Sequence, residues 1–472
     1  MIPFLSGTMF FIFLLRLLYE FHKIHHYENY TITNHFFSLH CYGQCWEKIS
    51  EPQDTTSMSF SISTDGTLWG WGIGILGNGN LSSENSPVLI SSATDWNTIY
   101  NSYDIHLGIK EDSTLWGWGY NNYGEMANGS TSFQLTPFPI GSSKWISISV
   151  SYGRVCGVKV DGTLWIWGED WPNPNIITMV QLGTASDWKK VKRDFDNFVG
   201  IKQNGTLWSW GGNYYGQLGL GNNTSTAVPT QVGSSSEWKD ISISGALTFA
   251  LKTNGTLWAC GSNSYGQLGN GTNINENSLI QIVPGSLWEK ISTACWGQSV
   301  MGVKTDGTLW GWGSNFSGNL GFGNTVSVNI PIQVGSDNNW KEVGANGSYS
   351  IGLKTNGSLY SWGDNNNGQL GNGTYISQLI PGLIGQVCIA GLEDSAPELN
   401  WIKLFPNPTN SAIQVQFDKH LLGKSYRIYD QSARVMIENY ILNSNFSIDL
   451  SNCESGIYFF NVEEQVIKIV KE

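Results

Sequence analysis

The sequence predicts an all-β protein, a seven-bladed β-propeller followed by a small C-terminal β-sandwich. The string Thr-Leu-Trp, or a near copy, recurs seven times at spacings of 43 to 52 residues. An Asp-Gly or Asn-Gly pair precedes six of the seven copies, and no stretch between Trp46 and Val387 shows a sustained helical period. Repeats of this length, each with several short strands, are typical of propeller blades.

The composition excludes several other classes. The chain has 472 residues, with 56 Gly and 22 Trp, and only 13% of its residues are charged. A helical bundle would be rich in Ala, Glu, Lys and Leu, and a disordered chain would not hold 13% aromatic residues. The net charge is −12 and no basic block is present, so we expect no nucleic-acid partner.

Two further Trp positions recur in register with the Thr-Leu-Trp aromatic. One precedes it by 20 to 23 residues and the other follows it by two, and together the three positions hold 19 of the 22 Trp. Burial of so many large rings predicts that they pack the blades. The fifth repeat has Cys260 at the third position, where we expect a small buried apolar side chain.

Each repeat centres on a predicted hairpin. Asn254-Gly255 lies between two stretches of β-type residues, and equivalent pairs occur in all repeats except the second, which has Asp112-Ser113. Such pairs favour a two-residue type I′ turn with positive φ at both central residues.

These residues carry a family resemblance. The pattern T-D-G-T-L-W-G-W-G, then S-N-x-x-G-Q-L-G-x-G and P-x-Q-[IV], resembles the regulator of chromosome condensation repeat over about Trp46 to Val387. The resemblance implies seven four-stranded blades. The first repeat is shortened after its hairpin, and the third lacks the glycine-rich segment. Many family members have a His eleven residues before the Thr-Leu-Trp aromatic, but no repeat of this chain does.

Short segments between the first two strands of each repeat differ from one repeat to the next. Rotational symmetry predicts that they share one face, and exposed Tyr, Trp and Arg are favoured at protein-binding hot spots. The alternative is that these segments are surface loops whose sequences vary because they bind no ligand. The candidate binding residues on this face are Tyr103, Tyr152, Arg154, Arg193, Asp194, Phe195, Asp196, Trp296 and Tyr349.

Catalytic patterns are scarce, so we expect no enzyme activity, no cofactor and no metal site. Five of the seven His precede the first repeat, and His106 is expected to be a strand residue rather than a base. The seven Cys are scattered, and a pairing of Cys41 with Cys45 or of Cys295 with Cys388 stays open.

A different composition follows the repeats. Residues 45–387 form the predicted propeller, 388–400 a linker and 401–472 a small sandwich whose alternating strands include I-Q-V-Q-F and I-Y-F-F-N-V. This last segment resembles the C-terminal sorting domain of the type IX secretion system, and an ordinary adhesive domain is the alternative. The matching residues are Phe405, Pro406, Asn407, Pro408, Gly456, Tyr458, Lys468 and Lys471.

Export by that system requires an N-terminal signal, and residues 1–44 form an atypical one. The apolar stretch Phe4–Tyr19 is interrupted by Arg16 and is too short for a stable transmembrane span. Phe36–Gln44 resembles the end of a signal peptide. An upstream start or a frame disruption is our hypothesis for this region.

The sequence therefore predicts a propeller that is secreted or held at the outer cell surface and binds another macromolecule. The expected partners are the type IX machinery and an unknown protein or glycan ligand. A carbohydrate-binding or adhesion module is the main alternative, and a guanine-nucleotide exchange factor-like protein or a hydrolase is a weaker one.

Overall fold

The structure is a computed structural model of the whole chain. It describes residues 44–52, 57–170, 173–294, 298–385, 402–417, 421, 424–430, 434–443, 445–462 and 465–472. The expected export region up to residue 43, the expected linker and Trp296 lie outside the described residues.

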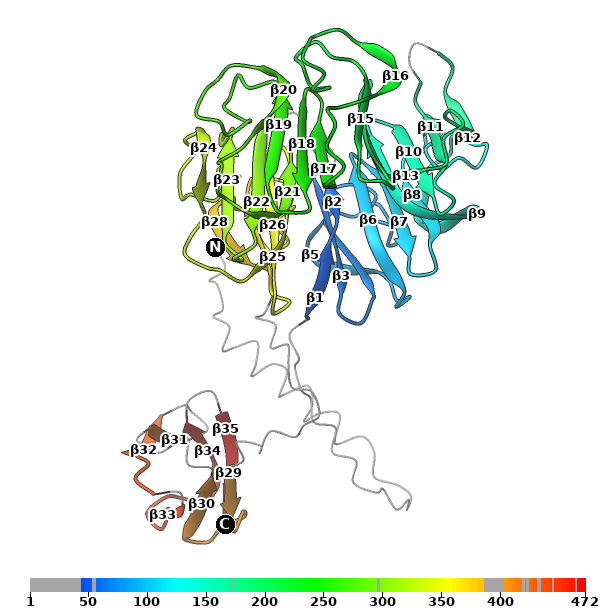
Figure 1. Cartoon of the computed structure of the whole chain (residues 1–472). Helices are drawn as coiled ribbons and strands as arrows, with labels where there is room; N and C mark the ends of the chain where they lie inside the picture. The colour runs from blue at the N-terminus through cyan, green and yellow to red at the C-terminus, as the bar shows by residue number, and fades with distance from the viewer. Residues whose placement is uncertain are drawn as a thin grey trace, which may run out of the picture. The chain divides into compact units, whose positions relative to one another are not determined.

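Seven four-stranded antiparallel blades form the propeller (Figure 1). Blade 1 contains β1 (Trp46–Ile49), β3 (Met58–Ser63), β4 (Leu68–Gly72) and β5 (Glu84–Ser91). Blade 2 contains β6 (Trp96–Ser102), β7 (Ile105–Lys110), β8 (Thr114–Gly119) and the first part of β9 (Gln134–Ser151). Blade 3 contains the rest of β9 with β10 (Arg154–Lys159), β11 (Leu164–Gly168) and β12 (Ile176–Gln181). Because β9 runs from the outer edge of blade 2 into the inner edge of blade 3, the seven strands of these two blades form one sheet, and β2 (Glu51–Pro52) adds an eighth strand beside β6.

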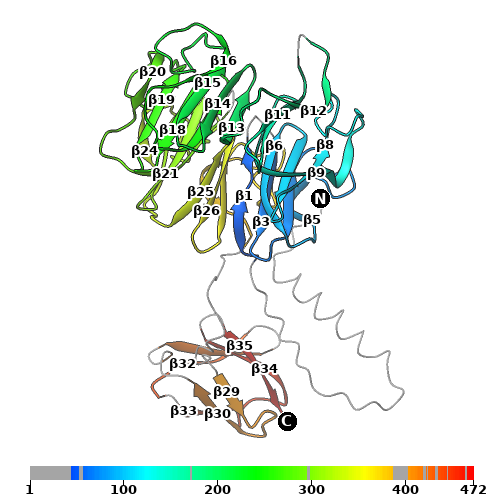
Figure 2. The ribbon, with the colours of Figure 1, turned by 45° about the vertical axis from the view of Figure 1, so that its right-hand side comes forward.

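Blades 4 to 7 are regular. Blade 4 contains β13 (Trp188–Asp194), β14 (Asn197–Lys202), β15 (Leu207–Gly211) and β16 (Thr226–Gln231), and blade 5 contains β17 (Trp238–Ser244), β18 (Leu247–Lys252), β19 (Leu257–Gly261) and β20 (Glu276–Gln281). Blade 6 contains β21 (Trp288–Thr293), β22 (Ser299–Lys304), β23 (Leu309–Gly313) and β24 (Val328–Gln333). Blade 7 contains β25 (Trp340–Ala345), β26 (Tyr349–Lys354), β27 (Leu359–Gly363) and β28 (Gln378–Leu383). The ring closes where β1 lies beside β25 and β26 (Figures 1 and 2).

The repeated Trp residues pack the blades, as predicted. The first and third Trp of the described repeats are buried. The aromatic ring of the Thr-Leu-Trp position is half-buried, and in blades 2 to 7 a Lys side chain lies over it, as where Lys304 Nζ lies 3.5 Å from the Trp310 ring centroid. The third Trp also joins neighbouring blades, because Trp312 Nε1 donates a hydrogen bond to the Gln267 carbonyl oxygen at 2.9 Å. Cys260 is fully buried at the equivalent position of blade 5, as expected.

The type I′ prediction for the Asp-Gly and Asn-Gly turns is wrong. Positive φ is found at the glycine, 82° at Gly66, but not at Asp65. Gly66 N–H donates to the Ser63 carbonyl and Ser63 N–H to the Thr67 carbonyl, so the loop has three residues and ends in a glycine bulge. The Asp65 carboxylate explains the difference, because it accepts hydrogen bonds from both the N–H and the hydroxyl of Thr67.

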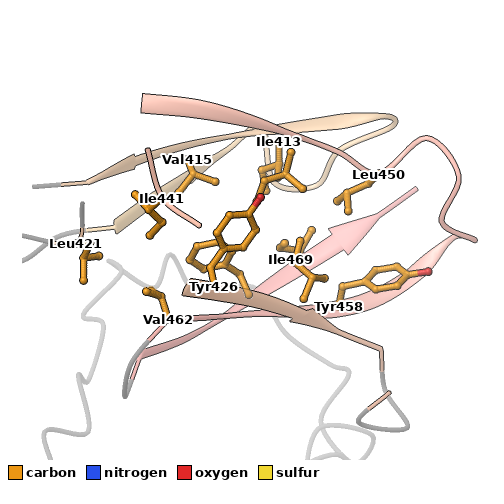
Figure 3. Packing of buried hydrophobic residues seen from close by; sticks show 12 residues of the cluster. Ile413, Val415, Leu421, Tyr426, Ile441, Leu450, Tyr458, Val462 and Ile469 are labelled. Carbon is orange, nitrogen blue, oxygen red and sulfur yellow. The ribbon is translucent and has the colours of Figure 1, made fainter. Parts of the chain in front are cut away.

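The C-terminal unit consists of two sheets that share one apolar core (Figure 3). One sheet has the order β29-β30-β33 and the other β32-β31-β34-β35. Ile413 and Val415 of the first sheet pack with Tyr426 and Ile469 of the second. The strands are β29 (Ile402–Phe405), β30 (Ala412–Phe417), β31 (Ser425–Tyr429), β32 (Val435–Tyr440), β33 (Asn445–Asp449), β34 (Gly456–Val462) and β35 (Gln465–Lys471).

Candidate functional site

The turns between the first two strands of blades 2, 3 and 4 bring three aromatic side chains into one stack. Tyr103 and Tyr152 have ring centroids 5.0 Å apart at an interplanar angle of 62°, and Tyr152 and Phe195 are 4.3 Å apart at 27°. Tyr103 is 44% exposed, and the other two rings are half-buried. Three of the predicted binding residues therefore meet on one face.

All three aromatic residues of this stack adopt left-handed backbone conformations. Their φ angles are 47° at Tyr103, 47° at Tyr152 and 45° at Phe195. The equivalent residue of blade 5 is Gly245, the residue type that accepts this conformation without strain. A non-glycine residue in this conformation costs about 1–2 kcal/mol, so each of the three turns holds a strained aromatic residue.

Two cavities border the stack. One of about 390 Å³ is lined by Tyr103, Tyr120, Tyr123, Tyr152 and Phe195, together with polar residues. The other, of about 400 Å³, is lined by Phe195, Tyr214, Tyr215 and Tyr265 with neutral polar side chains and Asp196. Both volumes fall in the range of small ligand pockets.

The aromatic surface continues beyond the predicted residues. We define the aromatic arc as Tyr103, Tyr120, Tyr123, Tyr152, Phe195, Tyr214, Tyr215, Tyr265 and Phe316, which lie on blades 2 to 6. The most exposed members are Tyr214 at 81% and Phe316 at 71%. Several of them follow the Asn that opens each glycine-rich segment, and this N-x-aromatic pattern was the signal that could have found them.

Four predicted binding residues are not exposed. Arg154, Arg193 and Asp194 are each at most 7% exposed, and Tyr349 is 2% exposed. Arg154 is covered because it forms ion pairs with Glu169 at 3.1 Å and with Asp196 at 2.9 Å. Tyr349 is buried at the ring closure, where its hydroxyl donates to the Met58 carbonyl oxygen at 2.7 Å.

Arg193 and Asp194 are buried beneath the turns that carry the aromatic stack and bond to those turns. Asp194 accepts hydrogen bonds from the Ser151 hydroxyl of blade 3 and from the Gly245 N–H of blade 5. Arg193 lies over the Phe198 ring at 5.0 Å and donates through Nε to the Phe195 carbonyl oxygen at 3.4 Å. Asp196 is exposed, and Trp296 lies outside the described residues. The two buried residues hold the turns in place rather than present side chains to a ligand.

Sequence reasoning missed the charged centre of the propeller. A cavity of about 280 Å³ is lined by the first strands of the blades and by β2 (Glu51–Pro52), which pairs in parallel with β6. Lys190 pairs with Asp240 at 2.6 Å and Lys192 with Glu51 at 2.5 Å. Although burial opposes ionisation of Glu51, Lys192 and Lys190 hold its pKa at about 2. The signal was the charged residue two positions after several first-strand Trp residues.

Two other titratable side chains of the described propeller, His106 and Cys156, are fully buried. His106 is a fully buried strand residue whose ring lies 4.6 Å from the Phe60 ring, and burial lowers its pKa to about 3. Burial raises the pKa of Cys156 to about 12. Cys45 is disulfide-bonded, which agrees with an oxidising destination.

The predicted sorting residues of the C-terminal unit lie at the end of β29, in the segment that follows it, and on β34 and β35. Phe405, Pro406, Asn407 and Pro408 are exposed, and the Asn407 side-chain oxygen accepts a hydrogen bond from Val470 N–H at 2.8 Å. Gly456 pairs with Lys471 across β34 and β35, and Lys468 pairs with Phe459. Tyr458 is buried, and its hydroxyl donates to the Glu454 carbonyl oxygen at 2.8 Å. The Phe405–Pro408 segment is thus fastened to the last strand.

Seven four-stranded blades around a polar centre define the protein as a seven-bladed β-propeller. The regulator of chromosome condensation (RCC1) repeat model matches residues 204–251, 254–299, 306–353 and 356–397, and a second model of this repeat matches 238–267 and 340–369. The model of the secretion system C-terminal sorting domain matches residues 403–472. The chain is an RCC1-repeat propeller that carries a type IX sorting domain, and it is secreted or attached at the cell surface.

Solved structures agree with this fold. Human WBSCR16 is similar with a TM-score of 0.57 and 18% identity, over 64% of this chain and 85% of that one. Prp20p from Saccharomyces cerevisiae is similar with a TM-score of 0.59 and 19% identity, over 73% of this chain and 88% of that one. Yeast RCC1 (Prp20) bound to Kap60 is similar with a TM-score of 0.57 and 18% identity, over 78% of this chain and 91% of that one. Among curated proteins no match was found.

Within the described residues, no helix is long and apolar enough to span a bilayer.

Proposed function

We propose that this exported propeller binds a partner protein through the aromatic arc. The observation that carries the proposal is the stack of Tyr103, Tyr152 and Phe195, each held at positive φ on a different blade. Strained conformations of this kind persist where the surrounding structure enforces them, and they cluster at functional sites. Tyr side chains are also enriched at the centres of protein interfaces, because they bury a large area at little cost in conformational entropy.

The solved neighbours support the same class of function. The Prp20p structure is described together with binding to Gsp1p and histones, and the other yeast structure contains Kap60. At 18–19% identity these proteins share only the fold with this chain, so their partners are not carried over. They support the narrower idea that a propeller of this repeat type serves as a scaffold for protein binding.

A glycan ligand is the competing function, because a sugar ring also stacks on aromatic faces. The face-to-face packing of Tyr152 on Phe195, with an interplanar angle of 27°, disfavours it, since each ring loses one of its faces to the other. Protein contact at ring edges and hydroxyls remains available.

The test compares capture by the full-length protein and by two variants. The double variant Tyr152→Ala/Phe195→Ala removes two rings of the stack, and Tyr375→Ala removes a ring that is 53% exposed outside the arc. Each is used to capture proteins from a cell-surface extract, and each is applied to a glycan array. We expect wild type and Tyr375→Ala to capture the same protein and the double variant to lose it. Retention by the double variant, or selective binding on the array alone, would refute protein binding through this face.

A further inference from the structure

The cavity beside Tyr103 has an acidic floor. We call it the Glu125 pocket, after the residue at its base. Tyr103, Tyr120, Tyr123 and Tyr152 form its walls, and each of the first three is between 41% and 44% exposed. The charged residues that line or border it are Asp104, Glu125, Arg154, Glu169 and Asp196.

Arg154 does not neutralise this floor. Its guanidinium pairs with Glu169 and Asp196 at 3.1 and 2.9 Å. Within the described part of the chain, neither Glu125 nor Asp104 forms an ion pair. Among the residues that line the pocket, three are acidic (Asp104, Glu125 and Glu169) and Arg154 is the one base, and Glu125 is 1% exposed.

Glu125 stands where other repeats have a neutral amide. Its Oε2 accepts a hydrogen bond from Tyr123 N–H at 3.0 Å. Gln217 and Gln267 make the same bond to Tyr215 and Tyr265 N–H, at 3.0 and 2.8 Å. A negative charge is thus not needed to build this loop, so its presence in blade 2 calls for another explanation.

Burial works against that charge. It raises the pKa of Glu125 to about 7, although hydrogen bonds from the backbone N–H groups of Glu125 and Tyr123 lower the pKa, and nearby Glu169 adds a smaller rise. Burial likewise raises the pKa of Asp104. A cation placed among these carboxyl groups would restore the electrostatic balance that the fold leaves incomplete.

We propose that the Glu125 pocket binds a protonated Lys or Arg side chain of the partner protein. Tyrosine walls attract a cation through their ring faces, and the floor carboxylates pair with its charge. The neighbouring cavity has Gln217 and Gln267 where this one has Glu125. The inference rests on the proposed function, since Tyr103 and Tyr152 belong to both sites.

The experiment uses the full-length protein and small probes observed by saturation-transfer NMR. The cationic probes are Nα-acetyl-lysine amide and Nα-acetyl-arginine amide, and the neutral control is Nα-acetyl-norleucine amide. Glu125→Gln removes the floor charge and keeps the hydrogen bond to Tyr123. Glu111→Gln is the matched control. Glu111 is exposed and follows the C-terminal end of β7, whereas the pocket residue Asp104 precedes the N-terminal end of that strand.

We expect wild type and Glu111→Gln to bind the cationic probes and Glu125→Gln to bind them at least about tenfold more weakly, with no binding of norleucine amide. Cation affinity should increase as the pH rises through neutrality, because Glu125 ionises beside Asp104, Glu169, Asp196 and Arg154. Equal binding by Glu125→Gln or equal binding of the neutral probe would overturn the proposal.

The same variants separate the two proposals. If a partner is lost in the Tyr152→Ala/Phe195→Ala variant but captured fully by Glu125→Gln, protein binding stands and the cation pocket fails. If no partner is captured but the lysine probe binds in a Glu125-dependent way, the pocket stands and the proposed function fails.

Discussion

Trp71 and Gln369 join the first blade of the propeller to the seventh. The Trp71 indole Nε1 donates a hydrogen bond to the Gln369 carbonyl oxygen at 2.9 Å, and the ring is fully buried. The two residues are 298 positions apart, so this contact closes the ring. Trp362 makes the same contact with the Asn319 carbonyl oxygen inside the ring, and closure thus uses the interaction that joins adjacent blades elsewhere.

Trp71→Phe should destabilise the propeller. The variant removes the indole N–H from a buried carbonyl oxygen and leaves space at the junction, which costs about 1–3 kcal/mol. Urea unfolding followed by Trp fluorescence measures the loss. Trp69→Phe is the control, because Trp69 is half-buried and bonds only within its own hairpin to Thr67. Equal stability of the two variants would contradict a special role for the closure contact.

The blade lattice could be predicted from the sequence because it repeats. Trp recurs in register at the positions of Trp46 and Trp71 in the other repeats, and a ring of seven such repeats can bury these side chains. The turn type could not be read from the Asp-Gly pair alone, since the Asp65 side chain bonds to Thr67 and selects a three-residue loop. Tyr349 was misplaced because its position at the closure depends on blade 1, which a comparison of repeats does not show.

The candidate site was predicted only in part. Tyr103, Tyr152 and Phe195 follow from rotational symmetry, because equivalent turns lie on one face. The burial of Arg154 depends on Glu169, which follows β11, and on Asp196 in the turn between β13 and β14, and these positions have no repeated spacing. Long-range ion pairs of this kind leave no pattern in a single sequence.

Asn263→Ala should be among the most destabilising changes in blade 5. Its buried side chain accepts a hydrogen bond from Leu268 N–H at 2.9 Å and donates to the Thr272 and Ile274 carbonyls at 3.0 Å. Loss of these three contacts leaves buried backbone groups unsatisfied and costs about 2–4 kcal/mol. Chemical denaturation should show this loss, whereas Asn273→Ala, an exposed position in the same loop, should change stability little. A small effect of Asn263→Ala would mean that the glycine-rich segment holds its shape without it.

Phe195→Gly should leave stability nearly unchanged. Glycine relieves the left-handed strain of about 1–2 kcal/mol, while the lost stacking on Tyr152 costs about 0.5–1.5 kcal/mol. Blade 5 has Gly245 at this position, so the turn tolerates the change. Thermal unfolding should fall within a few degrees of wild type, and partner capture should fail. A large fall in melting temperature would instead assign the ring a packing role.

Glu125→Gln should stabilise the protein in a pH-dependent way. Burial raises the folded-state pKa of Glu125 from its ordinary 4.5 to about 7, so between these values the folded protein holds a proton that the unfolded chain has released. Its contribution to stability therefore falls as the pH rises through this window. Near pH 4 the variant should match wild type, and at about pH 8 it should be more stable by about 3 kcal/mol, an upper value because the site relaxes. Urea unfolding at both pH values measures the difference, with Glu111→Gln as the exposed control. A constant difference at both pH values would show that Glu125 is not the titrating group.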